Sequence, residues 1–364
     1  MAETVRFDAP TAAESGDPQA WMDANLRLND ILTVGTHNSY HLRTHPEIFA
    51  IMKRAAPETW WHLDYEHPPL LDQLEDGARA LELDVIHDPE GGRYAHPMGL
   101  THAGLANTPA YVRAMSQPGL KVLHIQDLDF RSSVFTYIEG LSIIRDWSRA
   151  HRRHTPILIT MNTNDSSSRT RNGTHGLPFD EVAYDRLDAE VRSVFGPDQL
   201  LTPDDVRGDY PTLREAVLAR GWPKLGDVRG KVLLAIDEKE AHIAAYRGAR
   251  LALEGRACFV NVDEDSPMAG YITLNENKDV ARIRAAVEAG FLVRTRADSE
   301  TIEARSGDTT RRDAALASGA QWVSTDYRRP EPGLTDYCVR LPGDAITVEN
   351  PVRAAGKCAR IPIE

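Results

Sequence analysis

Short continuous runs of apolar residues alternate with amphipathic stretches along most of the chain. Runs rich in Val, Ile and Leu, rather than alternating patterns, are typical of parallel strands buried on both faces. They predict strands at DILTVG (30–35), RALELDVI (79–86), KVLHIQ (121–126), PILITM (156–161), KVLLAI (231–236), ACFVNV (257–262), FLVRTR (291–296) and QWVST (321–325). Several stretches with helical spacing end in Gly, and we expect helices at 71–78, 135–152, 179–196, 212–221, 279–290 and 310–319.

Eight strands that alternate with helices predict an α/β fold, a (β/α)8 TIM barrel over residues 28–328. Residues 1–27 then form an N-terminal extension. The tail, 329–364, contains PEPG, LPGD and NPV and predicts an irregular C-terminal extension packed on the barrel. Because chemistry in such a barrel lies at the C-terminal ends of the strands, candidate functional residues are sought there.

Composition excludes some function classes. The 364 residues include 54 acidic and 42 basic side chains, a net charge of −12. This balance argues against a nucleic-acid partner, which would require clustered Lys and Arg, and against simple electrostatic docking on anionic membranes. No apolar run approaches the roughly 18 residues of a membrane helix.

The N-terminus shows no signal-peptide pattern, and cysteine usage bears on the compartment. A bridge between Cys338 and Cys358, with Cys258 buried, would suit export, whereas three free thiols would suit the cytosol. We expect the bridge, and a secreted or periplasmic monomer whose leader is not part of this sequence; a cytoplasmic location stays open.

Polar residues follow the first two predicted strands. Strand one runs into GTHNSYH, which contains His37 and Asn38. Alternation places Glu82 and Asp84 on one face of strand two. Two buried carboxylates repel each other unless a cation or base neutralises them. The alternative is an edge strand with solvated carboxylates.

Later strand ends add histidine, amide and guanidinium groups. His124 lies in the third strand, and the fourth ends in TMNTND with Asn162 and Asn164. Arg294 and Arg296 share one face of FLVRTR, where guanidinium groups suit phosphate recognition; structural Arg–Asp pairs are the alternative.

The last strand closes with Asp326 and Tyr327, which we take as further substrate contacts. Two histidines, an oxygen-ligand cluster and arginine together indicate metal-assisted phosphodiester chemistry. Oxygen ligands favour Ca²⁺, or less strongly Mg²⁺, over zinc. The cation would stabilise phosphate charge, and the histidines would donate a proton and a transition-state hydrogen bond.

Three motifs, GTHNSYH, YEHPPLLDQLEDGARALELDV and VLHIQDLDFRSS, resemble the calcium-dependent phosphatidylinositol-specific phospholipase C family, particularly its bacterial secreted branch. LLTPDDV, GWPKLGDVRGKVLLAID, GFLVRTRAD and ASGAQWVSTDY extend the resemblance over residues 28–328. The resemblance implies a TIM barrel, a Ca²⁺ ion and attack by an inositol hydroxyl on its own phosphodiester. The products would be a cyclic inositol phosphate and diacylglycerol.

By the same resemblance, His37 and His124 match the two catalytic histidines. Asn38, Glu82 and Asp84 match metal ligands, and we assign Glu82 as the carboxylate that doubles as general base.

The fourth strand departs from the family pattern, which usually has Glu followed by Lys two residues on. This chain has Asn162 and Asn164 there. Asn162 can still bind calcium, with one negative charge fewer. Without the Lys, a soluble polyol or sugar phosphodiester stays open as the substrate.

Three alternatives compete with this hypothesis. A glycerophosphodiester phosphodiesterase would show an HRG-type first strand, absent here. An inactive ligand-binding homologue would fit Asn162 and Asn164, but both histidines and both strand-two carboxylates are intact. A zinc site of His37, His41 and His45 is disfavoured because Gly and Pro bracket the segment as a loop.

The long segment after strand one carries apolar and aromatic residues, among them Trp60 and Trp61. Trp favours membrane interfaces, so this segment predicts transient contact with lipid. The alternative is that the helical spacing of EIFAIMKRA covers the barrel.

Overall fold

The computed structural model describes residues 11–276, 280–358 and 361–364. Within these ranges the strands form three hydrogen-bonded sheets, in the orders β12-β1-β11-β10-β9, β2-β5-β7-β8 and β4-β3-β6. Their bounds are β1 (Ile31–Thr36), β2 (Ala80–Glu82), β3 (Val85–Ile86), β4 (Lys121–Val122), β5 (Ile157–Met161), β6 (Thr163–Asn164), β7 (Val232–Ile236), β8 (Phe259–Val260), β9 (Tyr271–Thr273), β10 (Leu292–Arg296), β11 (Trp322–Thr325) and β12 (Thr347–Glu349).

The two larger sheets are parallel apart from one strand. β12 pairs antiparallel with β1, whereas β1, β11, β10 and β9 run parallel to one another, as do β2, β5, β7 and β8. The fold is therefore mixed α/β. The carboxyl ends of the parallel strands within each larger sheet lie at the same edge, as the apolar runs predicted.

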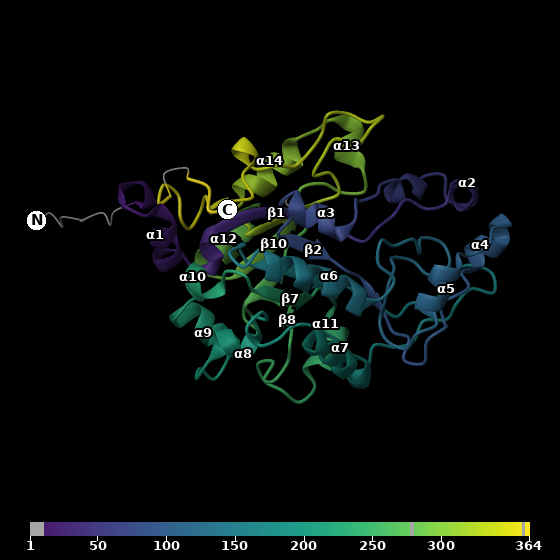
Figure 1. The fold of residues 1–364 in the computed structure, drawn as a ribbon, viewed down its shortest axis with the longest axis horizontal. Coiled ribbons are helices and arrows are strands. Elements are labelled where there is room, and N and C mark those ends of the chain that lie inside the picture. The colour runs from purple at the N-terminus through teal and green to yellow at the C-terminus, as the bar shows by residue number, and fades with distance from the viewer. Residues whose placement is uncertain (1–10, 277–279, 359–360) are drawn as a thin grey trace, which may run out of the picture.

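Helices surround the strands, which lie near the centre of the view in Figure 1. They are α1 (Pro18–Asn25), α2 (Pro46–Ala55), α3 (Leu70–Glu75), α4 (Met98–Ala103), α5 (Pro109–Met115), α6 (Tyr137–Ala150), α7 (Glu181–Val194), α8 (Pro203–Arg207), α9 (Leu213–Ala219), α10 (Leu225–Val228), α11 (Glu240–Arg247), α12 (Val280–Ala289), α13 (Ile302–Ser306) and α14 (Thr310–Ala317). α6 and α7 begin at N-caps, where Thr136 and Asp180 accept backbone N–H groups. Their apolar faces pack into the main core with strand residues.

One strand prediction was wrong, and one strand was missed. KVLHIQ was expected to be a parallel strand over 121–126, but only β4 forms, and it pairs antiparallel with β3. The chain turns instead, because Ile125 and Asp129 exchange two backbone hydrogen bonds of 3.0 Å. β9 was missed, since YIT offers only three residues, and it lies beside β10.

The predicted disulfide is also wrong: Cys258, Cys338 and Cys358 are all free. Cys358 is buried in the main core cluster. Tyr337 and Val339, which flank Cys338, belong to a second cluster. The two tail cysteines therefore pack in different parts of the molecule.

Gly35 allows β1 and β2 to approach closely. Arg79 N–H donates to the Val34 carbonyl over 3.3 Å, and a Cβ at Gly35 would lie 2.1 Å from the Ala80 carbonyl oxygen. This backbone contact cannot be relieved by a rotamer change.

We therefore expect Gly35→Ala to lower the free energy of unfolding by about 1–3 kcal/mol or more, as overpacked cores do. Urea unfolding would measure the change. Gly16→Ala is the matched control, because Gly16 is exposed with open space around it. Equal stability of the Gly35 variant and wild type would contradict the close approach.

Candidate active site

The strand register brings the predicted residues of three strand ends together. Thr36 lies opposite Thr325, and Arg296 lies opposite Ser324. The residues that follow β1 and β11, His37 and Asp326, therefore lie beside the last residue of β10.

His37 and Asp326 form the centre of this group. His37 Nδ1 lies 2.8 Å from Asp326 Oδ1, and Arg296 donates to the other carboxylate oxygen over 2.9 Å. Arg296 Nη1 lies 3.3 Å from His37 Nε2. Burial alone would raise the pKa of Asp326, but His37 and Arg296 hold that pKa well below its usual range. Burial, and then Arg296, lower the pKa of His37.

Glu82, at the end of β2, is buried and paired with Arg294. Arg294 also donates to Ser324 Oγ over 3.0 Å and lies 3.9 Å from Asp237 Oδ2. Burial would raise the pKa of Glu82, but Arg294, together with His37, lowers it. Arg294 thus neutralises buried carboxylates, which matches the structural alternative for this residue.

Asp84 is buried close to Glu82 and carries the opposite pKa shift. Tyr40 donates to Asp84 Oδ2 over 3.0 Å, and the Asn162 N–H donates to Oδ1 over 3.3 Å. Burial, and then the charge of Glu82, raise the pKa of Asp84 to about 7. A bound cation would relieve this repulsion.

Two amides complete the oxygen donors. Asn38 donates from Nδ2 to the Tyr65 hydroxyl over 2.9 Å, and its Oδ1 is buried with no partner among the described residues. Asn162 donates from Nδ2 to the Asp237 carbonyl, so its Oδ1 is the atom that could bind a cation. Because a buried acceptor without a partner is costly, Asn38 Oδ1 favours a bound ion.

His124 lies across the site on the turn that follows β4. Its Nδ1 is 2.8 Å from Asp129 Oδ2, and His41 Nε2 is 2.8 Å from the same oxygen. His41, His124 and Asp129 are residue types that bind metals, but these separations are those of hydrogen bonds. The disfavoured zinc trio does not form within the described ranges, since His45 packs near Phe130 instead.

The remaining predicted residues occupy varied surroundings. Asn164 donates to the His124 carbonyl over 3.1 Å. Tyr327 is buried in the second apolar cluster, and its hydroxyl has no hydrogen-bond partner in the part of the chain that the structure describes. Trp60 is half-buried against Phe49 and Lys53, and Trp61 is half-buried on η3 (Trp60–Leu63).

Sequence reasoning missed several residues of the site. Asp237 directly follows the KVLLAI run, a signal that could have identified it. Tyr65 begins the motif YEHPPLLDQLEDGARALELDV, but only the fold brings its hydroxyl to Asn38. Asp129 was visible in the motif VLHIQDLD, but only the fold brings it to His41.

A family model described as Ca²⁺-dependent phosphoinositide phospholipase C matches residues 26–351. The chain belongs to this family. The predicted resemblance is thereby confirmed, and the chain is a phosphodiester-cleaving enzyme of the phospholipase C type. Calcium is the metal of the family, and the buried Asn38 oxygen, which has no partner among the described residues, fits such an ion.

Solved bacterial structures share the fold of this phospholipase C. A calcium-dependent phosphoinositol-specific phospholipase C from Pseudomonas sp., described as a myo-inositol complex, is 18% identical with a TM-score of 0.55, covering 92% of this chain and 97% of the other. The Ca²⁺-dependent enzyme from Streptomyces antibioticus is 18% identical with a TM-score of 0.50, covering 82% and 94%. No curated protein matches the chain.

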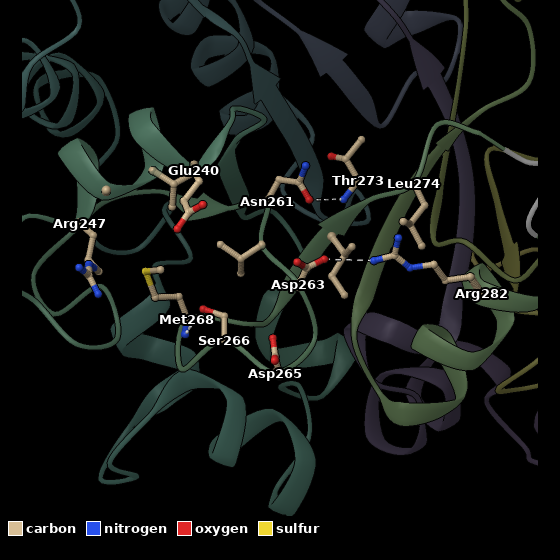
Figure 2. A pocket seen from close by; sticks show the side chains of 14 residues that line it. Glu240, Arg247, Asn261, Asp263, Asp265, Ser266, Met268, Thr273, Leu274 and Arg282 are labelled. Carbon is tan, nitrogen blue, oxygen red and sulfur yellow. Dashed lines mark hydrogen bonds and ion pairs between the residues drawn. The ribbon is translucent and has the colours of Figure 1, made fainter.

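A pocket of about 450 Å³ lies beside α11 and the segment between β8 and β9 in this phospholipase C, with Glu240, Arg247, Asp263 and Asp265 in its wall (Figure 2). A second hollow of about 400 Å³ shares Asn261, Thr273, Leu274 and Arg282 with it and includes Asp237. Asp237, in the wall of the second hollow, has its Oδ2 3.9 Å from Arg294 Nη1. Across the described ranges, every helix is too short or too polar to cross a membrane.

The Arg294–Glu82 pair predicts a large stability effect. Removal of one partner from a buried ion pair typically costs about 3–5 kcal/mol, because a charge is left uncompensated. We expect Arg294→Gln to lower the free energy of unfolding by this amount in calcium-free protein, and the double variant with Glu82→Gln to recover most of it.

Arg153→Gln is the control, since Arg153 pairs with Asp23 at an exposed site and should change stability by about 1 kcal/mol or less. Urea unfolding would measure all four proteins. Equal losses in the Arg153 and Arg294 variants would refute the role of Arg294.

Proposed function

We propose that this enzyme cleaves phosphatidylinositol-like phosphodiesters in a calcium-dependent reaction. An inositol hydroxyl attacks the phosphorus of its own diester, giving a cyclic inositol phosphate and diacylglycerol. The arrangement that carries the proposal is a pair of histidines, each with a carboxylate on Nδ1, beside two buried carboxylates.

Asn38, Glu82, Asp84 and Asn162 would hold the Ca²⁺ ion. When bound, the ion would stabilise phosphate charge and make the attacking hydroxyl more acidic. All four residues offer oxygen donors, which calcium prefers to nitrogen or sulfur. Mg²⁺ is the less favoured occupant, because it demands a more regular geometry.

The two histidines differ in a way that suits opposite roles. Asp129 raises the pKa of His124 against the effect of burial, so His124 suits the proton donor to the leaving oxygen. His37, whose pKa is lowered, lies with its Nε2 3.9 Å from Glu82 Oε1. His37 and Glu82 would face the attacking hydroxyl, with Glu82 as general base.

Substrate contacts follow from the same geometry. Arg296 lies at the end of β10 beside His37, where a guanidinium could contact the phosphate. Asn164 would contact ring hydroxyls near His124. Asp326 would act through His37, and Arg294 through Glu82, whereas the burial of Tyr327 supports a packing role.

A soluble polyol or sugar phosphodiester is the second candidate substrate. The hollow that Asp237 lines favours it, because its wall adds the polar side chains of Asn275 and Glu276. In the adjoining pocket, the Arg247 Nε is buried with no partner among the residues that the structure describes, so a hydroxyl group could accept from it. Asn162 and Asn164, which stand where the family usually has Glu and Lys, favour the same substrate class.

We further propose that the strands close into one (β/α)8 barrel. Two contacts support this: the isolated parallel bridge between Asn261 and Tyr271, and the hydrogen bond from Arg79 to Val34. These would join the two larger sheets at both edges. β9, between β8 and β10, would be the eighth strand, whereas β2 pairs directly with β5 where the strand 121–126 was predicted.

A lipid substrate would require contact with a membrane, and Trp60 and Trp61 are the proposed contact. Both are only half-buried, beside the amphipathic helix α2. A secreted or periplasmic location would give access to such lipid.

Calcium binding tests the ligand set directly. In calorimetric titrations of chelator-stripped protein, we expect Asp84→Asn to abolish binding and Asn38→Ala to weaken it by at least about tenfold. Asp72→Asn is the matched control, because Asp72 is exposed on α3. Wild-type affinity in the Asp84 variant would rule out this site.

Cleavage assays test the function. We expect calcium-dependent cleavage of phosphatidylinositol vesicles, with a cyclic product visible by ³¹P NMR. His37→Ala and His124→Ala should each lower kcat by about 10²–10⁴, whereas exposed His102→Gln should not.

The substrate arms of the same assay separate the alternatives. Cleavage of a soluble inositol or glycerol phosphodiester but not of vesicles would favour the second substrate, and a Trp60→Ala, Trp61→Ala variant should then be unaffected. Calcium binding without turnover on any diester would indicate a ligand-binding homologue and overturn the proposal.

A further inference from the structure

α11 presents one stripe of residues to the pocket shown in Figure 2. Glu240, Ile243, Ala244 and Arg247 all line this cavity of about 450 Å³, and their spacing of three and four residues places them on one face of the helix. Ile243 is buried, Glu240 is exposed and Arg247 is half-buried. The stripe therefore carries a carboxylate at the start of the helix, a guanidinium at its end and apolar side chains between them.

The segment between β8 and β9, together with β9, supplies an apolar wall. Met268 and Ile272 are buried and line the pocket together with Leu274. In Figure 2, Met268 lies at the same end of the pocket as Glu240 and Arg247, on the left of the view. A cavity of this size, with apolar walls and a few polar groups, is typical of a site for a small molecule.

The polar groups of the pocket differ in whether the protein already uses them. Arg282 lies 3.2 Å from Asp263 Oδ1, so this pair is satisfied within the protein. The Arg247 Nε is buried without a partner, and over the described ranges its guanidinium makes no ion pair. Glu240 and Asp265 likewise make no ion pair within those ranges. One donor group and two acceptor groups are therefore available to a ligand.

These groups favour a neutral ligand that carries hydroxyls. An anion in the pocket would meet the carboxylates of Glu240 and Asp265, and a cation would meet the guanidinium of Arg247. A hydroxyl can donate to a carboxylate and accept from a guanidinium at the same time. The apolar wall around Met268 would cover the C–H bonds of a ring that bears such hydroxyls.

We propose that this pocket binds a neutral saccharide. In the part of the chain that the structure describes, its lining includes none of the residues proposed to hold calcium or to carry out cleavage. Asn261 and Thr273 line both this pocket and the hollow that contains Asp237. Two sources therefore have the required chemistry, a sugar unit carried by the substrate and a free saccharide. Only the first of them rests on the proposed function.

Met268 provides a local signal for binding. In calcium-free protein labelled with ¹³C-methyl-methionine, the Met268→Leu spectrum assigns the Met268 methyl group. We expect the methyl glycosides of glucose, galactose or mannose, or maltose, to shift this signal saturably. The signal of Met115, in a separate apolar cluster, should stay unchanged. The absence of a saturable shift with all four saccharides would overturn the proposal, and so would a shift with only the charged sugars glucuronate and glucosamine.

Variants of the α11 stripe test which groups bind the saccharide. Arg247→Met keeps the length of the side chain but removes its donors, and should weaken binding by at least about tenfold. Arg250→Met is the matched control, because Arg250 lies one turn further along the chain and outside the described lining, and should leave the affinity unchanged. Equal affinity of the Arg247 variant and wild type would refute the assignment. If this variant does not fold, the wild-type titration still decides.

Cleavage assays separate the two sources of the saccharide. A soluble inositol phosphodiester that carries a sugar unit should show a lower KM than the plain diester if the substrate supplies the sugar. Arg247→Met should then remove this difference and leave kcat unchanged. Equal KM values, with the Met268 shift present, assign the pocket to a free saccharide. A Met268 shift without cleavage of any diester keeps the saccharide site and refutes the proposed function.

Discussion

The cost of burying negative charge at the ends of parallel strands governs this molecule. Glu82, Asp84 and Asp326 are all buried within a few residues of the carboxyl ends of β2 and β11. Two of them are neutralised by arginines of one strand, since Arg294 pairs with Glu82 and Arg296 with Asp326. Over the described ranges, the hydrogen-bond donors to Asp84 are neutral, the Tyr40 hydroxyl and the Asn162 N–H, so an added cation would stabilise this carboxylate most.

This charge balance explains why the arginines are on β10 and not on a loop. Alternation along a strand places side chains two residues apart on one face, so Arg294 and Arg296 reach different carboxylates without competing. In the parallel register of β10 with β11, Arg294 lies opposite Trp322 and Arg296 opposite Ser324. This register fixes how far along the strands each ion pair lies. The scaffold thus orients His37 by first fixing its anionic partner, Asp326.

Much of this could be predicted from the sequence, because buried parallel strands leave an unambiguous apolar pattern. The ends of those runs identified His37, Glu82 and Arg296. The apolar pattern failed where a strand is too short to leave a recognisable run, as at β9. It failed also where a turn interrupts an apolar run, as after β4. Contacts such as Tyr65 with Asn38 could not be predicted, because residues far apart in the chain meet only through folding.

His124 stands on a part of the molecule with its own small core. The apolar cluster around Ile86, Leu123 and Phe130 is separate from the main one, and the β4-β3-β6 sheet has no strand in common with the larger sheets. Regions with separate packing open locally at a lower free-energy cost than global unfolding. Thermal inactivation of this enzyme would then begin with displacement of one histidine while the larger sheets stay intact, so activity and global melting need not share a midpoint temperature.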